Sequence, residues 1–375
     1  MDAQVAVIGT GSIGSMALWQ LAKTGVTAIG FEQFGIGHDQ AAAGGESRIF
    51  RTAYLEGPQY VPLLQRAYEM WRDLEAESGR DLLTLGGGLM IGHRDSDAMR
   101  NVLASIHEFD LAHDVLDADQ MANRYPQHRM RPGETAILDH QAGFLRPEFA
   151  VASAAYRAQE LGATLAAHTR VTAVEPAAGH VTVRTPDRDY TVEQAVVTAG
   201  PWTSRFAPAL REHVRPHRLV MTWYQAKDPA AWQPEVFPVF IRDADTAHIF
   251  GIPTLDGGSV KVAPHAAYGS FDDGDDLDRN VDVADLAPIN ASVADLLPGL
   301  IPEPVRVSAY MDAYTTDGHA LVGRAPGVDN VWLLGGFSGH GFKMAPAFGQ
   351  VAADLVRGGR TDLPIAHLDP ARFGA

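Results

Sequence analysis

The sequence of 375 residues contains no cysteine. This absence excludes disulfide bonds, zinc sites with cysteine ligands, thiolate nucleophiles and any covalent link through a cysteine sulfur. Basic residues are also few: 30 Lys and Arg against 46 Asp and Glu give a formal net charge of −16. A nucleic-acid-binding protein needs a basic surface to neutralise phosphates, so we expect no nucleic-acid partner. A local group of Lys and Arg can still bind an anionic ligand.

Long apolar runs are missing as well. Charged or turn residues interrupt every apolar stretch before it reaches the roughly 20 residues of a transmembrane helix. The first apolar segment begins at Val5, which leaves no room for the charged region of a signal peptide. We therefore expect no membrane segment and a cytoplasmic location. The length predicts two domains, and 46% hydrophobic with 20% charged residues is typical of a globular chain.

Residues 4–34 have the pattern of a dinucleotide-binding unit. An apolar strand over 4–8 is followed by a glycine-rich turn, a helix over 15–24 and a second strand over 26–31 that leads into Glu32. The glycines of the turn are Gly9, Gly11 and Gly14.

Each part of this unit has a physical role in binding a dinucleotide. Gly9 makes the tight turn, Gly11 lets the backbone approach a pyrophosphate, and Gly14 allows the helix to pack closely on the strand. The helix N-terminus offers free N–H groups to the phosphates. The Glu32 carboxylate is placed to accept hydrogen bonds from ribose hydroxyls.

The rest of the chain predicts further elements of the same domain at both ends of the sequence. Helices are expected over 58–78 and 147–161, and a final strand over 331–336 leads into a helix over 345–357. Strands are expected at 164–174, 180–184, 190–192 and 193–198. Strand–glycine–helix units at both ends indicate a parallel-sheet domain that is discontinuous in sequence.

The fold class is therefore α/β, with an α+β substrate domain: a Rossmann-like domain with an inserted mixed or antiparallel-sheet domain. We assign residues 1–83, 144–213 and 315–375 to the first domain and residues 84–143 and 214–314 to the second. In the second domain, short strands are expected to alternate with turns, and the acidic stretch 272–285 is expected to be a solvated surface segment.

Three further blocks of sequence stand out beside the glycine turn. One is Gly45-Glu-Ser-Arg48-Ile-Phe-Arg51-Thr-Ala-Tyr54-Leu-Glu-Gly57, and another is Gly258-Ser-Val-Lys261 ahead of His265. The last joins Thr316-Asp-Gly-His319 to Gly335-Gly-Phe-Ser-Gly-His-Gly-Phe-Lys343. In this order, the four blocks resemble the monomeric sarcosine oxidase family of FAD-dependent amine oxidases, which includes N-methyltryptophan oxidases.

The resemblance implies a two-domain flavoprotein with FAD extended across the first domain and its ring between the domains. Arg48 would lie near the ring, and Arg51 with Lys343 would hold the substrate carboxylate. Lys261 would face the flavin where oxygen reacts, and a helix beginning near Ala345 would point its positive end at the ring. The residues implied to bind FAD are Gly9, Gly11, Ser12, Ile13, Gly14, Glu32, Gln33, Ser47, Arg48, Val171, Ala199, Gly200, Trp202, Gly336, Phe337, Gly339, His340, Gly341 and Lys343.

Taken singly, these residues have simpler interpretations. Arg48 and Arg51 could form surface ion pairs, Lys261 could face solvent, and the glycine turn could be a chance turn. The histidines of the blocks could be structural, and their spacing suggests no metal site. The joint occurrence of four blocks in order favours the functional interpretation.

The sequence departs from the family pattern at two places. Ala43 and Gly44 stand where the family often has paired histidines. Tyr310 stands where monomeric sarcosine oxidases attach the flavin to a cysteine, and Asp312 occupies a position that is often aromatic in the family. Without any thiol, FAD must be held non-covalently, unless a histidine makes the link.

The resemblance predicts an FAD-dependent oxidase of an amino acid with a secondary (N-methyl or cyclic) or primary amine. A hydride equivalent would pass to flavin and leave an imine, and oxygen would reoxidise the flavin to give hydrogen peroxide. The alternatives are a flavin dehydrogenase with another acceptor, a non-catalytic flavin-binding subunit, or an NAD-dependent dehydrogenase. The expected partners are a small amino-acid or amine substrate and oxygen, in a monomer or weak homo-oligomer.

Overall fold

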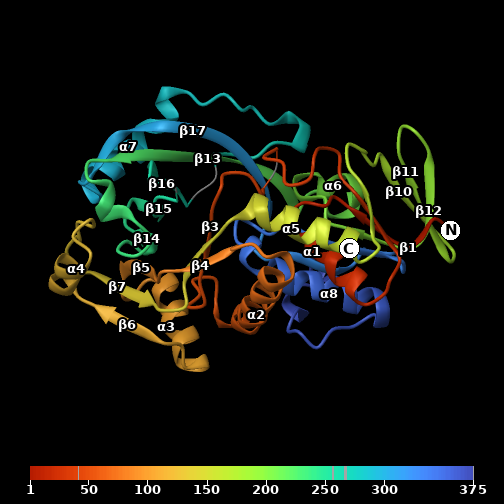
Figure 1. Ribbon diagram of the computed structural model, residues 1–375, viewed down its shortest axis with the longest axis horizontal. Helices are drawn as coiled ribbons and strands as arrows, with labels where there is room; N and C mark the ends of the chain where they lie inside the picture. The colour runs from red at the N-terminus through yellow and green to blue at the C-terminus, as the bar shows by residue number, and fades with distance from the viewer. Residues whose placement is uncertain (41, 256, 266–267, 375) are drawn as a thin grey trace.

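The computed structural model describes residues 1–40, 42–255, 257–265 and 268–374. Most of its strands belong to one of two large sheets. The antiparallel strands of the first sheet, within residues 173–197, lie near the N-terminus (Figure 1). Strands β5 (Gly88–His93), β6 (His113–Leu116) and β7 (Glu134–Asp139) of the second sheet lie toward the other end of the molecule.

The first sheet has the order β10-β11-β12-β1-β2-β9, with β19 beside β12 and β18 beside β19. Its strands are β1 (Ala3–Ile8), β2 (Ala28–Phe31), β9 (Thr164–Ala166), β10 (Ala173–Ala177), β11 (His180–Arg184), β12 (Asp189–Val197), β18 (Leu321–Arg324) and β19 (Val331–Gly335). Because β1 pairs in parallel with both β2 and β12, Ile8 lies opposite Phe31 on one side and Val197 on the other. The loops that follow these three strands therefore meet at one edge of the sheet, where dinucleotide-binding folds place their ligand.

Helices cover one face of this sheet, and large apolar side chains of these helices are buried in the core between them and the sheet. They are α1 (Ser12–Lys23), α2 (Val61–Ser78), α5 (Pro147–Glu160) and α8 (Ala345–Gly358), and α1 contacts both α5 and α8. Trp19, Trp71 and Phe348 are fully buried in the resulting core. Burial of side chains of this size is the main stabilising contribution to such a layer.

The second sheet has the order β17-β13-β16-β15-β14-β5-β7-β6. Its further strands are β13 (Val214–Ala226), β14 (Val239–Ala244), β15 (Ala247–Ile252), β16 (Ser259–Pro264) and β17 (Leu300–Thr315). The helices in this part of the chain are α3 (Asp97–Phe109), α4 (Ala118–Arg124) and α7 (Val283–Leu296). β13 and β17 pair along almost their whole length, from Val214 opposite Thr315 to Ala226 opposite Leu300, and run side by side across the molecule (Figure 1).

A small sheet, β3-β8-β4, carries the segment that begins at Arg48. Its strands are β3 (Arg48–Phe50), β4 (Leu83–Leu85) and β8 (Gly143–Leu145). The remaining helical pieces are α6 (Thr203–Phe206) and the short 3-10 helices η1 (Pro58–Tyr60), η2 (Gly200–Trp202), η3 (Pro208–Leu210), η4 (Pro229–Trp232), η5 (Gly274–Asp276), η6 (Phe342–Met344), η7 (Ala366–Leu368) and η8 (Pro370–Phe373).

The strands of the two large sheets fall on the two sides of the domain boundaries expected from sequence, apart from the last residue of β17, Thr315. The division into residues 1–83, 144–213 and 315–375 against residues 84–143 and 214–314 is compatible with this distribution. The boundaries themselves stay a prediction.

Several elements differ from the sequence-based expectations. The expected strand over 164–174 is divided, because His168 adopts a left-handed conformation (φ 54°) between β9 and β10, and a left-handed residue ends a strand. The segments expected at 190–192 and 193–198 form the single strand β12. The expectation of short strands between 217 and 314 was wrong for the long β13 and β17, and it missed α7.

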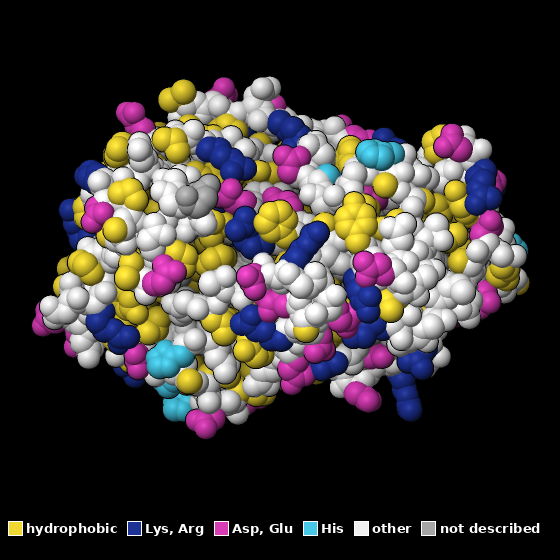
Figure 2. Space-filling model, viewed as in Figure 1, with side chains coloured by type: hydrophobic (Ala, Val, Ile, Leu, Met, Phe, Trp, Pro, Cys, Tyr) yellow, Lys and Arg dark blue, Asp and Glu magenta, His cyan; other side chains and the backbone are white. Residues whose placement is uncertain are grey.

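The surface carries charges of both signs. Acidic and basic side chains are interspersed over the face shown in Figure 2. No helix in the described part of the chain is long and apolar enough to span a bilayer.

Candidate functional site: two adjoining cavities

The glycine turn is built as the fingerprint requires. Gly9 has φ 90°, a conformation that favours glycine. A Cβ on Gly14 would lie 1.9 Å from the Gly9 carbonyl oxygen, so only glycine allows α1 to start this close to β1. A Cβ on Gly11 would meet no protein atom within 4 Å, which leaves the backbone there open to a ligand.

The N-terminus of α1 faces the same space. Gly11 occupies the N-cap position, and no side chain caps the helix. The first backbone N–H groups of a helix have no partner within the helix, and together with the helix dipole they attract anions. α1 begins at Ser12, three residues earlier than the sequence predicted, so Ser12 and Ile13 belong to its first turn.

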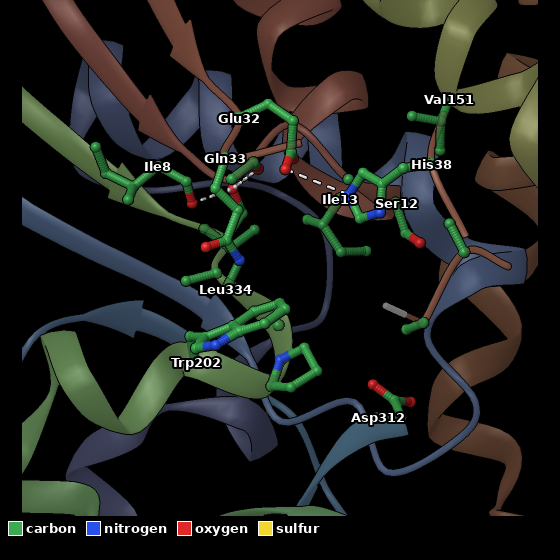
Figure 3. Close-up of a pocket in the computed structure, with 18 of the residues that line it drawn as sticks. Ile8, Ser12, Ile13, Glu32, Gln33, His38, Val151, Trp202, Asp312 and Leu334 are labelled. Atoms are coloured by element: carbon green, nitrogen blue, oxygen red, sulfur yellow. Dashed lines mark hydrogen bonds and ion pairs between the residues drawn. The ribbon is translucent and has the colours of Figure 1, made fainter. Parts of the chain in front are cut away.

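Glu32 follows directly on β2, and its side chain is 5% exposed. Its Oε1 accepts a hydrogen bond from the backbone N of Phe34 (3.0 Å) and lies 3.3 Å from Nε2 of His38. These contacts hold the carboxylate in the cavity that Figure 3 shows, with His38 opposite. His38 was not among the predicted site residues. No sequence pattern indicates that a histidine six residues after Glu32 would contact this carboxylate.

We call the cavity along this edge of the first sheet the fingerprint cleft. Among the residues predicted to bind the cofactor, those that line it are Gly9, Gly11, Ser12, Ile13, Glu32, Gln33, Arg48, Val171, Ala199, Gly200, Trp202, Phe337, Gly339 and Gly341. They come from segments far apart in sequence, as the labelled residues of Figure 3 show. The tertiary fold thus brings three of the four sequence blocks to one cleft.

The remaining predicted cofactor residues lie outside the lining of this cleft. Gly14 and Gly336 pack against protein atoms: the turn before α1 for the first, and the side chains of Thr315 and Val214 for the second. Ser47 is buried, and its carbonyl oxygen accepts hydrogen bonds from Arg48 and Lys261. His340 and Lys343 line an adjoining cavity.

This adjoining cavity, the second cavity, has a volume of about 360 Å³, which is in the range of small-molecule sites. It shares Ala42, Arg48, Asp312, Gly339 and Phe342 with the fingerprint cleft, so the two cavities adjoin. Its lining residues include Arg51, Glu56, Phe250, His265, Tyr314, His340 and Lys343.

Arg51 lies in the second cavity with a side chain that is only 2% exposed. Its Nη2 donates to both carboxylate oxygens of Glu56, at 2.8 and 2.7 Å, and its guanidinium lies 4.2 Å from the ring centroid of Tyr54. Among the described residues, Nε and Nη1 of Arg51 have no hydrogen-bond partner. Buried donors without partners are rare, so the guanidinium keeps unused donors that suit an anionic ligand.

Lys343 supplies a second cation to the same cavity. Its Nζ donates to the carbonyl of His340 at 3.0 Å and to the Tyr54 hydroxyl at 3.4 Å. Burial, with a further contribution from Arg51, lowers the pKa of Lys343 to about 7. Burial alone would raise the pKa of Glu56, but Arg51, His340 and Lys343 outweigh it and lower that pKa. Glu56 therefore stays ionised beside Arg51.

Tyr54 and His340 form a hydrogen-bonded pair that supports Lys343. The Tyr54 hydroxyl lies 3.0 Å from Nδ1 of His340, and Nε2 of His340 lies 3.0 Å from the carbonyl oxygen of Gly318. Burial lowers the pKa of His340 to about 4, so the imidazole is neutral at pH 7. The sequence block contained Tyr54, but no pattern in the sequence indicated this contact with a residue 286 positions away.

The side chains of Arg48 and Lys261 both donate hydrogen bonds to backbone carbonyls of residues 42–47. Arg48 donates to the carbonyls of Ser47 (2.7 Å) and Ala42 (2.6 Å), and also to that of Gly44. Lys261, 2% exposed, donates to the carbonyls of Gly45 and Ser47, each at 3.0 Å. Burial, and then Arg48, lower the pKa of Lys261 well below its usual value. Lys261 lines neither cavity in this arrangement, so its expected approach to a flavin stays a prediction.

Asp312 is the other residue that the sequence-based assignment of roles left out. It belongs to β17, lines both cavities, and accepts hydrogen bonds from the backbone N of Ala313 (2.8 Å) and of Gly339 (2.9 Å). Burial raises the pKa of Asp312 to about 6. The departure from an aromatic residue at this position was visible in the sequence, but its place between two cavities was not.

The acidic stretch at 272–285 also contributes to the site. The side chain of Asp275 accepts from Nε1 of Trp202 (2.8 Å), from Arg170 (2.6 Å) and from Arg205 (2.5 Å), all of which line the fingerprint cleft. The stretch is a surface segment at Asp275, as expected, because this side chain is 42% exposed, but the expectation did not include its contacts with the wall of the cleft.

Comparisons with known proteins agree with this geometry. The profile of the FAD dependent oxidoreductase family matches residues 4–355. The chain belongs to this family. It is 35% identical to a monomeric sarcosine oxidase of Streptomyces avermitilis over 376 residues, which cover 99% of this chain and 98% of that protein. It is 29% identical to an N-methyl-L-tryptophan oxidase of Escherichia coli over 379 residues, which cover 100% of both.

Solved structures share the fold. NikD, described as an unusual amino acid oxidase essential for nikkomycin biosynthesis, superposes with a TM-score of 0.86 at 22% identity, over 98% of this chain and 97% of that chain. The predicted resemblance to monomeric sarcosine oxidases, the two-domain flavoprotein fold and the FAD cofactor are thereby confirmed. The NAD-dependent alternative is wrong: the chain is an FAD-dependent oxidoreductase.

The residues of the fingerprint cleft fit FAD. Gly11 leaves open backbone beside the uncapped α1, which suits a pyrophosphate, and the buried Glu32 carboxylate suits ribose hydroxyls. Arg48, Asp312 and Phe342 line both the cleft and the second cavity. With no cysteine in the sequence, FAD is held without a cysteinyl link.

Proposed function

We propose that this protein is an FAD-dependent oxidase of an amino acid that carries a secondary (N-methyl or cyclic) or primary amine. The product of the oxidation is an imine, the electron acceptor is oxygen, and hydrogen peroxide is formed. The observation that carries the proposal is that Arg51, with two nitrogens that have no partner among the described residues, and Lys343 line one cavity, which adjoins the FAD cleft.

In this proposal, Arg51 and Lys343 bind the substrate carboxylate. The free Nη1 of Arg51 donates a charge-assisted hydrogen bond to it, and Lys343 adds a point charge. Glu56 accepts both of its hydrogen bonds from Nη2 of the same guanidinium and so restricts the orientation of Arg51. The clamp orients the rest of the substrate toward the fingerprint cleft.

When bound, FAD supplies the two-electron acceptor for the oxidation of the C–N bond. The protein contributes orientation and charge. Lys261 provides a buried positive charge beside the carbonyls of Gly45 and Ser47. A fixed cation at this position stabilises the negative charge that develops when oxygen is reduced. The relatives named sarcosine oxidase and N-methyl-L-tryptophan oxidase support an N-substituted amino acid as substrate.

The test separates the two half-reactions. Purified holoenzyme is mixed without oxygen with N-methyl amino acids, cyclic imino acids, and D- and L-amino acids, while the flavin absorbance is followed. Air is then admitted, and peroxide is measured. Bleaching followed by stoichiometric peroxide is the expected result.

Other outcomes identify the rival functions. Bleaching with slow reoxidation by oxygen but fast reoxidation by a quinone would identify a dehydrogenase. A yellow protein that no amine or amino acid bleaches would identify a non-catalytic flavin-binding subunit. Gel filtration and cell fractionation test the predicted monomer or weak homo-oligomer and the predicted cytoplasmic location.

A further inference from the structure

A buried carboxyl group lies at the junction of the two cavities and has no part in the clamp described above. Asp312 lines both the fingerprint cleft and the second cavity. Figure 3 shows its side chain at the edge of the open space of the cleft.

The carboxylate of Asp312 is fixed in place but not saturated. Ala313 N donates to Oδ1 (2.8 Å) and Gly339 N donates to Oδ2 (2.9 Å), so β17 and the turn after β19 hold one oxygen each. Each carboxylate oxygen can accept two hydrogen bonds, which leaves capacity on both oxygens. The two backbone contacts set the direction of that remaining capacity, because they prevent the side chain from turning away.

No cation of the described residues neutralises this carboxylate by a direct ion pair. Arg48 is the nearest cation by its electrostatic effect, but its guanidinium is engaged by the carbonyls of Ala42, Gly44 and Ser47. In the second cavity, Arg51 is paired with Glu56. A buried carboxylate without a cation is unfavourable, and the raised pKa of Asp312 reports this cost.

We propose that Asp312 determines specificity by binding a cationic nitrogen of the substrate, an ammonium group on the molecule whose carboxylate Arg51 and Lys343 hold. This inference rests on the proposed function and adds a second anchor to it. A ligand with an ammonium group gains a charge-assisted hydrogen bond and neutralises the buried carboxylate. A ligand of the same shape without the charge leaves Asp312 buried and unpaired, so the site rejects it.

The nitrogen has two sources in an amino-acid substrate. It is either the reacting amine, bound as an ammonium that transfers its N–H proton to the Asp312 carboxylate before a hydride equivalent leaves the carbon, or a basic group on the side chain. Both present the same chemistry to Asp312, and two pairs of matched ligands separate them.

The first pair is N,N,N-trimethylglycine and 3,3-dimethylbutanoate. They share a carboxylate and a trimethyl head of the same shape, and they differ in the positive charge on the head. Trimethylglycine has no nitrogen lone pair, so neither compound reacts, and each dissociation constant is read from the change in flavin absorbance of the holoenzyme. The quaternary nitrogen has no N–H, so this pair reports the charge without the hydrogen bond. If Asp312 binds the reacting amine, the wild type prefers trimethylglycine at least tenfold, and Asp312→Asn loses that preference.

The second pair is Nα-methyl-lysine and N-methyl-norleucine, which differ in a terminal ammonium group against a methyl group. The rate of anaerobic flavin reduction and the dissociation constant are measured for each. If Asp312 binds a side-chain cation, the wild type prefers the lysine derivative at least tenfold, and Asp312→Asn abolishes the preference. Asp312→Glu, which keeps the charge, restores part of it in either case.

Asp119→Asn is the matched control, because it removes one negative charge at an exposed position of α4 and should change neither preference. The flavin-to-protein ratio and the melting temperature establish that each variant is folded and loaded. If Asp312→Asn does not retain FAD, Asp312→Ser takes its place in both comparisons. The proposal is overturned if the wild type shows no cation preference with either pair, or if the loaded Asp312 variant keeps it.

Failure of this inference is distinguishable from failure of the proposed function. If no amine or amino acid reduces the flavin, the oxidase proposal fails, while the binding of trimethylglycine and 3,3-dimethylbutanoate still tests Asp312. If amino acids reduce the flavin but the matched ligands bind equally to the wild type, Asp312 has no such role and the oxidase proposal stands.

Discussion

Arg51 donates from a single nitrogen, Nη2, to both carboxylate oxygens of Glu56, and this geometry leaves Nε and Nη1 without a partner among the described residues. Glu56 lies only five residues further along the chain, so the pair is local. The local pairing keeps Arg51 charged and oriented before any substrate arrives. Preorganisation of this kind reduces the free energy that substrate binding must supply.

Replacing Arg51 by lysine tests the clamp. Arg51→Lys keeps a positive charge but loses the free Nη1 donor of the planar guanidinium, so the affinity for 3,3-dimethylbutanoate should fall roughly tenfold to a hundredfold, by the usual strength of hydrogen bonds to charged groups. The dissociation constant is measured by flavin absorbance. Arg94→Lys, at an exposed position, is the control and should bind normally. Equal affinity in Arg51→Lys and the wild type would show that the carboxylate binds elsewhere.

The pH dependence of carboxylate binding reports Lys343. Its pKa is lowered to about 7, so the cation is fully present below that pH and is lost as the pH rises through it. The affinity for 3,3-dimethylbutanoate should therefore fall above pH 7. Deprotonation of Asp312, with a pKa of about 6, adds a separate decrease at lower pH. In Lys343→Met, the decrease near pH 7 should disappear and the lower one should remain; persistence of both would assign the upper limb to another group.

Lys261 should govern the reaction with oxygen and not the reaction with substrate. We expect Lys261→Met to slow reoxidation of the reduced flavin by roughly 10² to 10³, the range for loss of one preorganised charge-stabilising group. Anaerobic reduction by substrate should be unchanged. Stopped-flow absorbance measures both steps, and Lys227→Met, an exposed lysine, is the control. A slow reduction step with normal reoxidation in Lys261→Met would contradict the assignment.

The oxygen reaction should also depend on pH in a defined direction. Burial and Arg48 lower the pKa of Lys261, so its positive charge is present at low pH and is lost as the pH rises through the lowered value. The rate constant for reoxidation should therefore decrease with rising pH in the wild type. In Lys261→Met, the remaining slow rate should be flat over the same range, and a preserved pH dependence would point to a different titrating group.

Substitution of two glycines of the fingerprint by alanine should affect two different properties, the stability of the protein and its affinity for FAD. A Cβ on Gly14 would lie 1.9 Å from the Gly9 carbonyl oxygen, so Gly14→Ala should lower the melting temperature of the apoprotein. A Cβ on Gly11 meets no protein atom, so Gly11→Ala should leave that temperature unchanged while FAD binds more weakly. Calorimetry and fluorescence titration with FAD give the two readouts. Normal FAD affinity in Gly11→Ala would mean that the pyrophosphate does not approach this backbone.

The contact between Asp275 and the wall of the fingerprint cleft should slow the loss of FAD. Asp275→Asn weakens its ion pairs with Arg170 and Arg205, and exposed pairs contribute up to about 1 kcal/mol each. We expect FAD to dissociate a few times faster, as followed by the rise of flavin fluorescence. Asp276→Asn, the exposed neighbour, should not change this rate. Identical rates in the two variants would show that Asp275 has no part in the retention of FAD.

Much of the cofactor half of the molecule follows from local sequence. The turn at Gly9, Gly11 and Gly14 restricts the backbone so strongly that strand, turn and helix can be read directly, and α1 differed only by starting three residues early. The absence of cysteine is equally direct, because it removes one chemistry of flavin attachment whatever the fold. Together with the four sequence blocks, these features were sufficient for the fold class, the cofactor and the family.

The second cavity could not be derived in this way, because its contacts join residues that are distant in sequence. Tyr54 meets His340 across 286 positions, and Asp312 reaches the junction of the cavities only because β17 pairs with β13 along its length. Helix α7 and the long strands β13 and β17 were not predicted for the same reason. Their side chains pack against residues that are distant in sequence, and no local pattern predicts such contacts. The sequence alone determined which chemistry the chain can support, and the tertiary structure decided which charges stand together, because burial and long-range pairing set their pKa values and their free donors.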